Sequence, residues 1–94
     1  MGTRSARPKP DRLPEKLRQI RHSLGYTLEE MAGALKGVKK SPPSRSHVLR
    51  FETGEREPSL FVLLEYSRVA RCPLELIVDD ELDLKLAGNV KKKR

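Results

Sequence analysis

The sequence has one cysteine, no tryptophan and few aromatic residues, which make up 4% of its 94 positions. Because Cys72 stands alone, no internal disulfide can form and no cluster of thiolates can bind zinc, and we expect this thiol to be a small buried apolar group. No apolar run approaches the roughly 18 residues that a membrane span needs, and the start of the chain lacks the apolar segment of a secretion signal. We therefore expect a cytoplasmic protein with no membrane partner.

Motifs for catalysis and for cofactor binding are also lacking. The chain has no Ser/His/Asp or Cys/His arrangement and no glycine-rich phosphate loop. The acidic run at 79–83 resembles a metal site in composition, but it lacks the glycine-containing ligand spacing of a calcium loop. We expect no enzyme activity, no cofactor and no metal, and we interpret the acidic run as a solvated exit from the last helix.

What the sequence does have is positive charge, and the charge is unevenly placed. The formal net charge is +7 and the pI is about 9.9, which makes a polyanion the first partner to consider. Residues 1–50 hold 12 Lys and Arg against 4 Asp and Glu, a net charge of +8, whereas residues 51–94 hold 8 against 9. We therefore expect residues 1–50 to make most of the contacts with a polyanion.

The apolar residues follow a helical period over most of the chain, and these signals predict an all-α bundle of about five short helices. Pro14 opens the first helix and Gly25 closes it, "TLEE" at 27–30 is a capping box, and Ser44 and Gly54 bound a helix at 45–53. Ser59 caps a fourth helix that ends near Arg71, and "PLELIV" predicts a fifth. In the fourth helix, the arc expected to face the core consists of Leu60, Leu63, Leu64, Ser67 and Ala70.

Three parts are predicted along the chain. Residues 1–12 form a flexible basic arm, since their composition cannot bury a core. Residues 13–80 form the helical domain. Residues 81–94 form a C-terminal extension, in which the alternation of Leu82, Leu84 and Leu86 predicts a short strand before a basic tail.

Three stretches together carry a resemblance to a known family. They are "LRQIRHSLGYTLEEMA" at 17–32, "SHVLRFETGEREPSL" at 46–60 and "LLEYSRVARCPLELIV" at 63–78. Their combination resembles the lambda-repressor-like, or Cro-type, helix-turn-helix family of DNA-binding proteins, over about residues 13–78. The resemblance implies a transcriptional regulator, which we expect to be a repressor, that reads double-stranded DNA with helix 45–53 as its recognition helix.

Helical geometry places Val48, Phe51 and Glu52 on one side of that recognition helix and Ser46 and Arg50 on the other. The resemblance implies that the positions of Arg45, Ser46 and Arg50, and sometimes that of His47, read bases. Arginine suits this role because its fork bonds to guanine O6 and N7. The alternative is that these arginines are solvated surface charges.

Further roles follow from the resemblance and from the caps. The family pairs the position of Glu52 with an arginine of the first helix, which corresponds to Arg21 here, so we expect a largely buried ion pair. Thr27 is a candidate phosphate contact. The link 36–44 is longer than the family's turn, and it either tilts the recognition helix, brings Lys39 and Lys40 to a phosphate strand, or is merely solvated. Leu28 also departs from the polar residue usual at its position.

A homodimer is expected, because members of the family usually bind as dimers. The candidate interface is an apolar set predicted to face away from the core, namely Phe61, Val62, Val69, Val78, Leu82 and Leu84. The alternative is that these residues complete the core of the monomer. Two other functions stay open: an antitoxin that binds its toxin through the C-terminal half, and a module that uses this half for a protein partner without specific DNA binding.

Overall fold

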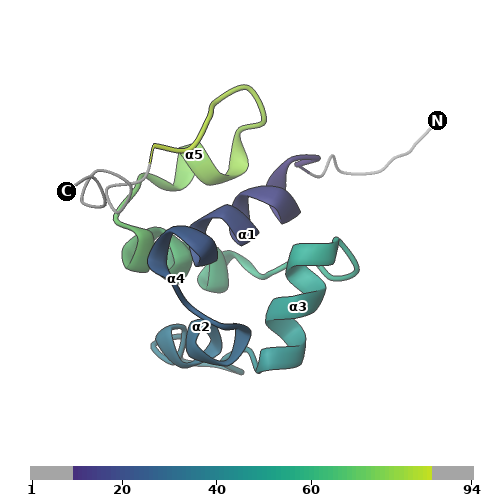
Figure 1. Ribbon diagram of the computed structural model, residues 1–94, viewed down its shortest axis with the longest axis vertical. Helices are drawn as coiled ribbons and strands as arrows, with labels where there is room; N and C mark the ends of the chain where they lie inside the picture. The colour runs from purple at the N-terminus through teal and green to yellow at the C-terminus, as the bar shows by residue number, and fades with distance from the viewer. Residues whose placement is uncertain (1–9, 86–94) are drawn as a thin grey trace.

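The computed structural model describes residues 10–85, and within this range five helices and no strand occur, in agreement with the predicted all-α class (Figure 1). Helices α1 and α4 lie in the middle of the molecule, α5 lies at one end, and α2 and α3 lie at the other. The strand expected near Leu82 and Leu84 does not form over residues 82–85. Residues 1–9, which are most of the predicted arm, and residues 86–94, which include Leu86 of the predicted strand and the basic tail, lie outside the described residues.

The first two helices begin and end as their local signals predict. Helix α1 spans Leu13–Leu24 with proline in its first turn, and it ends at Gly25, whose φ of 74° is the left-handed conformation that glycine adopts without strain. Helix α2 spans Leu28–Ala34. The Thr27 hydroxyl accepts from the Glu30 N–H at 3.1 Å and the Glu30 carboxylate accepts from the Thr27 N–H at 2.9 Å, which confirms the capping box.

The remaining helices are bounded by the same kinds of signal. Helix α3 spans Arg45–Thr53, between the Ser44 cap and Gly54, whose φ is 85°. Helix α4 spans Leu60–Ala70, and the Ser59 hydroxyl accepts from the Val62 N–H at 3.2 Å. Helix α5 spans Leu74–Val78 and ends where the chain turns back toward the start of α1.

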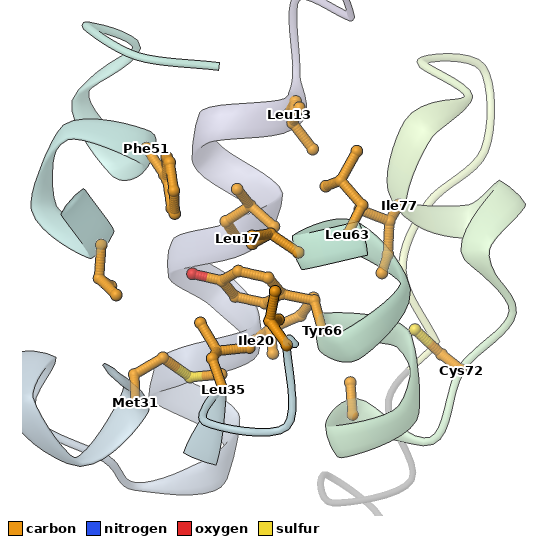
Figure 2. Close-up of a cluster of buried hydrophobic side chains, with 14 residues drawn as sticks. Leu13, Leu17, Ile20, Met31, Leu35, Phe51, Leu63, Tyr66, Cys72 and Ile77 are labelled. Atoms are coloured by element: carbon orange, nitrogen blue, oxygen red, sulfur yellow. The ribbon is translucent and has the colours of Figure 1, made fainter. Parts of the chain in front are cut away.

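One core joins all five helices, and α1 and α4 supply its centre. Leu17 and Ile20 of α1 are completely buried, and the ring of Tyr66 from α4 lies beside them in the middle of the cluster (Figure 2). Cys72 is buried at the edge of the core, as predicted, and burial raises the pKa of its thiol. The other buried apolar side chains are Leu13, Met31, Leu35, Val38, Val48, Phe51, Val62, Leu63, Ala70 and Ile77.

The buried face of α4 differs from the predicted arc. Val62, Leu63, Tyr66 and Ala70 face the core, whereas Leu60 is 59% exposed. Both arcs satisfy a helical period, and they differ by a small rotation of the helix. The observed rotation exchanges Leu60 and Leu64 for Val62 and Tyr66 at the core, so the two arcs have similar apolar content, and it places the ring of Tyr66 beside Leu17 and Ile20.

None of the helices in residues 10–85 combines the length and the apolar character needed to cross a membrane.

Candidate nucleic-acid interface

Helix α3 is seated by its apolar side and leaves a polar side open. Val48 is completely buried and Phe51 is 4% exposed, and the helix packs against both α1 and α2. Arg45, Ser46 and Arg50, whose positions the resemblance implies read bases, are exposed, and Leu49 beside them is 46% exposed. The helix therefore presents two guanidinium groups and a hydroxyl to solvent on a rigid support.

Arg50 is only loosely held by the protein. Its Nε lies 3.9 Å from a carboxylate oxygen of Glu55, and both side chains are more than half exposed. An exposed pair at this distance contributes little to stability and is easily broken. The guanidinium is therefore available to a hydrogen-bond acceptor such as a base edge.

His47 has a structural task at the start of α3. The ring Nδ1 of His47 accepts from the Ser44 backbone N–H at 3.1 Å, and the backbone N–H of His47 donates to the Ser44 hydroxyl at 3.4 Å. The half-buried ring also stacks on Phe51, with centroids 6.5 Å apart. The reciprocal cap with Ser44 was not foreseen, because histidine is not the usual partner in a capping box.

Arg21 and Glu52 join α1 to α3. The Arg21 guanidinium donates to both carboxylate oxygens of Glu52, at 2.8 and 2.9 Å, and it also donates to the Tyr26 carbonyl at 3.0 Å. The side chains are 15% and 4% exposed, so this is the largely buried pair that the resemblance implies. The hydrogen bonds to Glu52 raise the pKa of Arg21, which keeps it charged at every accessible pH.

The link between α2 and α3 folds back onto the protein. Val38 and Pro43 are buried, so the link is anchored at two points, whereas Lys39 and Lys40 between them are exposed. Close packing against α4 occurs at Gly37, where an added Cβ would lie 2.6 Å from a carboxylate oxygen of Glu65. Thr27, at the start of α2, is also exposed.

The predicted dimer surface is only partly available. Val62 is 5% exposed and belongs to the core, so the prediction that it faces away from the core was wrong, because α4 is rotated as described above. Val69, Val78 and Leu84 are partly buried and pack against the same core, and Leu82 is half-buried beside α1. Phe61, in contrast, is 66% exposed.

A buried lysine is the main feature that the sequence analysis missed. Lys16 is 1% exposed, and its ammonium group donates to the backbone carbonyls of Leu76, Asp79 and Leu82 at 2.8, 2.8 and 2.6 Å. The lysine thereby holds the end of α5 and the segment after it. Its position on the apolar stripe of α1, four residues before Ile20, is the signal that would have identified it.

The acidic run at 79–83 is part of the same arrangement, not the solvated exit that we expected. The Asp80 carboxylate accepts from the backbone N–H groups of Asp11 and Arg12 at 2.8 and 3.0 Å, and Arg12 pairs with Asp83 at 2.7 Å. The bonds from Arg12 hold the pKa values of Asp80 and Asp83 below their usual range, and the bond from the Asp11 N–H adds to the effect at Asp80. We call the contacts of Arg12 and Lys16 with residues 76–83 the terminal clasp.

Helices α2 and α3, seated together against α1 with the polar side of α3 exposed, form a helix-turn-helix, the arrangement of a large class of DNA-binding proteins. Residues 17–77 match the model of the helix-turn-helix family HTH_3, the lambda-repressor-like and Cro-like family. The match covers more than half of the chain, and the chain belongs to this family of DNA-binding transcription regulators. Searches with the chain found no matching curated protein and no matching solved structure.

Proposed function

We propose that this protein is a transcriptional repressor that binds specific double-stranded DNA sites as a homodimer, with α3 in the major groove. The observation that carries the proposal is the orientation of α3. Its apolar side and Glu52 are buried against α1 and α2, so Arg45, Ser46 and Arg50 share the solvent side of a rigid helix. The arginines of this set can form two hydrogen bonds to a guanine, and the Ser46 hydroxyl can bond to a base or to a phosphate.

Residues around α3 would position the protein on the phosphate backbone. Lys39 and Lys40 are exposed in the anchored link before α3, and Thr27 is exposed at the start of α2. Phosphate contacts of this kind fix register and orientation without reading sequence. His47, held by Ser44 at the first turn of α3, would act mainly by fixing the start of the recognition helix.

The homodimer is part of the same proposal. A two-fold dimer would place two recognition helices in major grooves roughly 34 to 36 Å apart, one helical turn of DNA. Of the predicted interface we leave out Val62, which is buried, and Phe61, which lines a separate groove described below. The interface we propose is made by the partly buried Val69, Val78, Leu82 and Leu84 at the α5 end. Repression by occupying a promoter needs no domain beyond this DNA-binding dimer, and a cytoplasmic location follows from the proposed role.

The test is a selection of binding sites from random duplex DNA by the purified protein at about 0.15 M salt, which already screens exposed charge strongly. An enriched inverted repeat is the expected result, with binding to that repeat at least 10³-fold tighter than to random DNA. The double variant Arg45→Ala/Arg50→Ala should lose the enrichment. Arg68→Ala serves as the control, because it removes an exposed arginine from α4, outside the recognition surface.

Failure of enrichment would overturn the proposal. If binding is sensitive to salt and equal on every sequence, the positive charge of the protein accounts for all of its DNA affinity. The alternative of a protein-interaction module would then be favoured, since Leu60 and Phe61 are large apolar side chains left exposed on α4.

A further inference from the structure

A groove lies between the link before α3 and helix α4. Its volume is about 490 Å³, and it is open to solvent along one side. Val38, Phe61 and Leu64 form its apolar floor, and Lys39, Lys40 and Arg68 form its rim. We call this hollow the α4 groove. It exists because the long link folds back onto α4, held by buried Val38 and by the contact of Gly37 with Glu65.

The apolar floor of the groove is unusually exposed at one residue. Phe61 is 66% exposed, although the neighbouring Val62 is buried in the core. An aromatic ring left in water gains free energy when an apolar partner covers it, and large exposed apolar groups with a polar rim are typical of interaction sites. The described chain leaves this ring open.

The rim of the groove carries excess positive charge. Glu65 is the one carboxylate that lines the groove, and it pairs with Arg68 at 2.7 Å while lying against Gly37. The Glu65 charge is therefore matched within α4. Lys39 and Lys40 remain as exposed cations on the opposite side of the groove.

This combination of charge and apolar surface selects among partners. A second copy joined through the same face would bring two sets of Lys39, Lys40 and Arg68 together, and like charges at an interface oppose association. Duplex DNA neutralises the lysines but offers no side chain to cover Phe61. A peptide with acidic groups on one side and apolar groups on the other satisfies both features.

We propose that the α4 groove binds an acidic amphipathic segment of a partner protein. Apolar side chains of the segment cover Phe61 and Leu64, and its carboxylates meet Lys39 and Lys40. Phe61 belongs to α4 and not to the exposed side of α3. Lys39 and Lys40 are also the proposed phosphate contacts, so bound DNA and the segment compete for these two lysines. The inference goes beyond DNA recognition and does not require it.

The test uses the full chain and two synthetic peptides. One peptide has Leu and Phe at helical spacing with Asp and Glu between them, and the other has the same apolar residues with Lys in place of every acid. Fluorescence anisotropy measures affinity, and NMR shifts of the backbone amides locate the site. The acidic peptide should bind at least tenfold more tightly than the basic one, with the largest shifts at 37–40 and 61–68.

Matched variants of neighbouring residues decide whether the groove is the site. Phe61→Ser should weaken binding of the acidic peptide at least tenfold, whereas Leu60→Ser should leave it unchanged, because Leu60 is 59% exposed on the same helix but does not line the α4 groove. Equal affinity of the two peptides, shifts elsewhere, or equal effects of the two variants would overturn the proposal.

DNA binding by the same variants keeps this inference distinct from the proposed function. Phe61→Ser should bind the selected DNA site as the parent protein does. If the parent protein selects no site but still binds the acidic peptide through Phe61, the groove stands and the repressor proposal fails. A monomer–dimer equilibrium abolished by Phe61→Ser would show that a second copy covers the ring, and this outcome would overturn the acidic partner.

Discussion

Arg21 and Glu52 are 31 positions apart in the sequence, and their side chains meet in two parallel hydrogen bonds of 2.8 and 2.9 Å. The pair connects α1 to α3, the proposed recognition helix, on the side opposite the proposed DNA contacts. Because Glu52 is almost fully buried, the pair sets both the stability of the domain and the orientation of α3.

Glu52→Gln should lower the free energy of unfolding by roughly 3 to 5 kcal/mol, because it leaves the mostly buried Arg21 without a counter-charge. Urea unfolding followed by circular dichroism measures the loss. The control is Glu55→Gln, which breaks the loose pair with Arg50 at the surface, where both side chains are more than half exposed. That change should cost less than about 1 kcal/mol, and equal losses in the two variants would contradict the structural role of the buried pair.

Lys16→Met should destabilise the protein by more than about 2 kcal/mol, because three backbone carbonyls lose a charged donor. Hydrogen exchange should also become faster at α5 and at residues 79–82, which the ammonium group holds. Arg18→Met changes an exposed position of the same helix and should have little effect on either measurement. Unchanged exchange in α5 of the Lys16 variant would show that the carbonyls do not depend on it.

Tyr66→Phe should leave stability unchanged or increase it. The Tyr66 hydroxyl is buried and has no hydrogen-bond partner among residues 10–85, and burial raises its pKa, so the hydroxyl is neutral and unsatisfied. Removing an unsatisfied buried polar atom removes a desolvation cost of about 1 to 3 kcal/mol. Thermal and urea unfolding measure the difference, and a loss above about 1 kcal/mol would reveal a bond to the hydroxyl.

Acid should destabilise the protein through the terminal clasp. The folded pKa values of Asp80 and Asp83 are lowered by their bonds to Arg12, whereas an unfolded aspartate titrates near pH 4. A lowered folded pKa stabilises the protein above the unfolded pKa, and this contribution is lost as pH falls through the folded pKa.

The free energy of unfolding is measured between about pH 6 and about pH 3. It should decrease as the pH drops under about 4, and the decrease should be steeper in the parent protein than in Asp80→Asn/Asp83→Asn. Glu81→Gln, which changes an exposed carboxylate of the same segment, should keep the parental slope. If the free energy of unfolding of the double variant depends on pH as steeply as that of the parent protein, the clasp is not the source of the acid sensitivity.

Arg50→Ala should relax the preference for one base pair in the selected DNA site and weaken binding there by roughly 1 to 3 kcal/mol, while affinity for random DNA falls only slightly. Competition binding against sites changed one base pair at a time measures this. Removal of residues 1–9 should instead weaken binding to every sequence alike, since Arg4, Arg7 and Lys9 supply charge outside the recognition helix. Equal effects of the two changes on all sequences would contradict the assigned roles.

Local signals account for what the sequence predicts well. The caps at Thr27, Ser44 and Ser59 and the glycines after α1 and α3 each act over a few residues, so their positions fix the helix boundaries directly. The rotation of α4 was not predictable in the same way. Two neighbouring arcs of that helix have similar apolar content, and the choice between them depends on how the ring of Tyr66 fits against Leu17 and Ile20.

Long-range polar contacts were predicted only where family resemblance supplied them. Arg21–Glu52 was expected on that basis, whereas the bonds of Lys16 and Arg12 to residues 60 to 71 positions away were not. A lysine on a helix and an acidic run near the end of a domain are each ordinary surface features when seen alone. Their contacts form only because α5 folds back beside α1, and the period of the apolar residues does not predict how two helices pack.

The terminal clasp also bears on the order in which the protein folds. Its hydrogen bonds join residues 60 to 71 positions apart, whereas each helix and its caps are made from contacts within a few residues. Closing the longest loop costs the most chain entropy, so we expect these bonds to form after α1 and α4 have packed. Arg12 and Asp83 lie at the surface, so we expect this end of the clasp to open before the buried contacts of Lys16 when the native protein fluctuates.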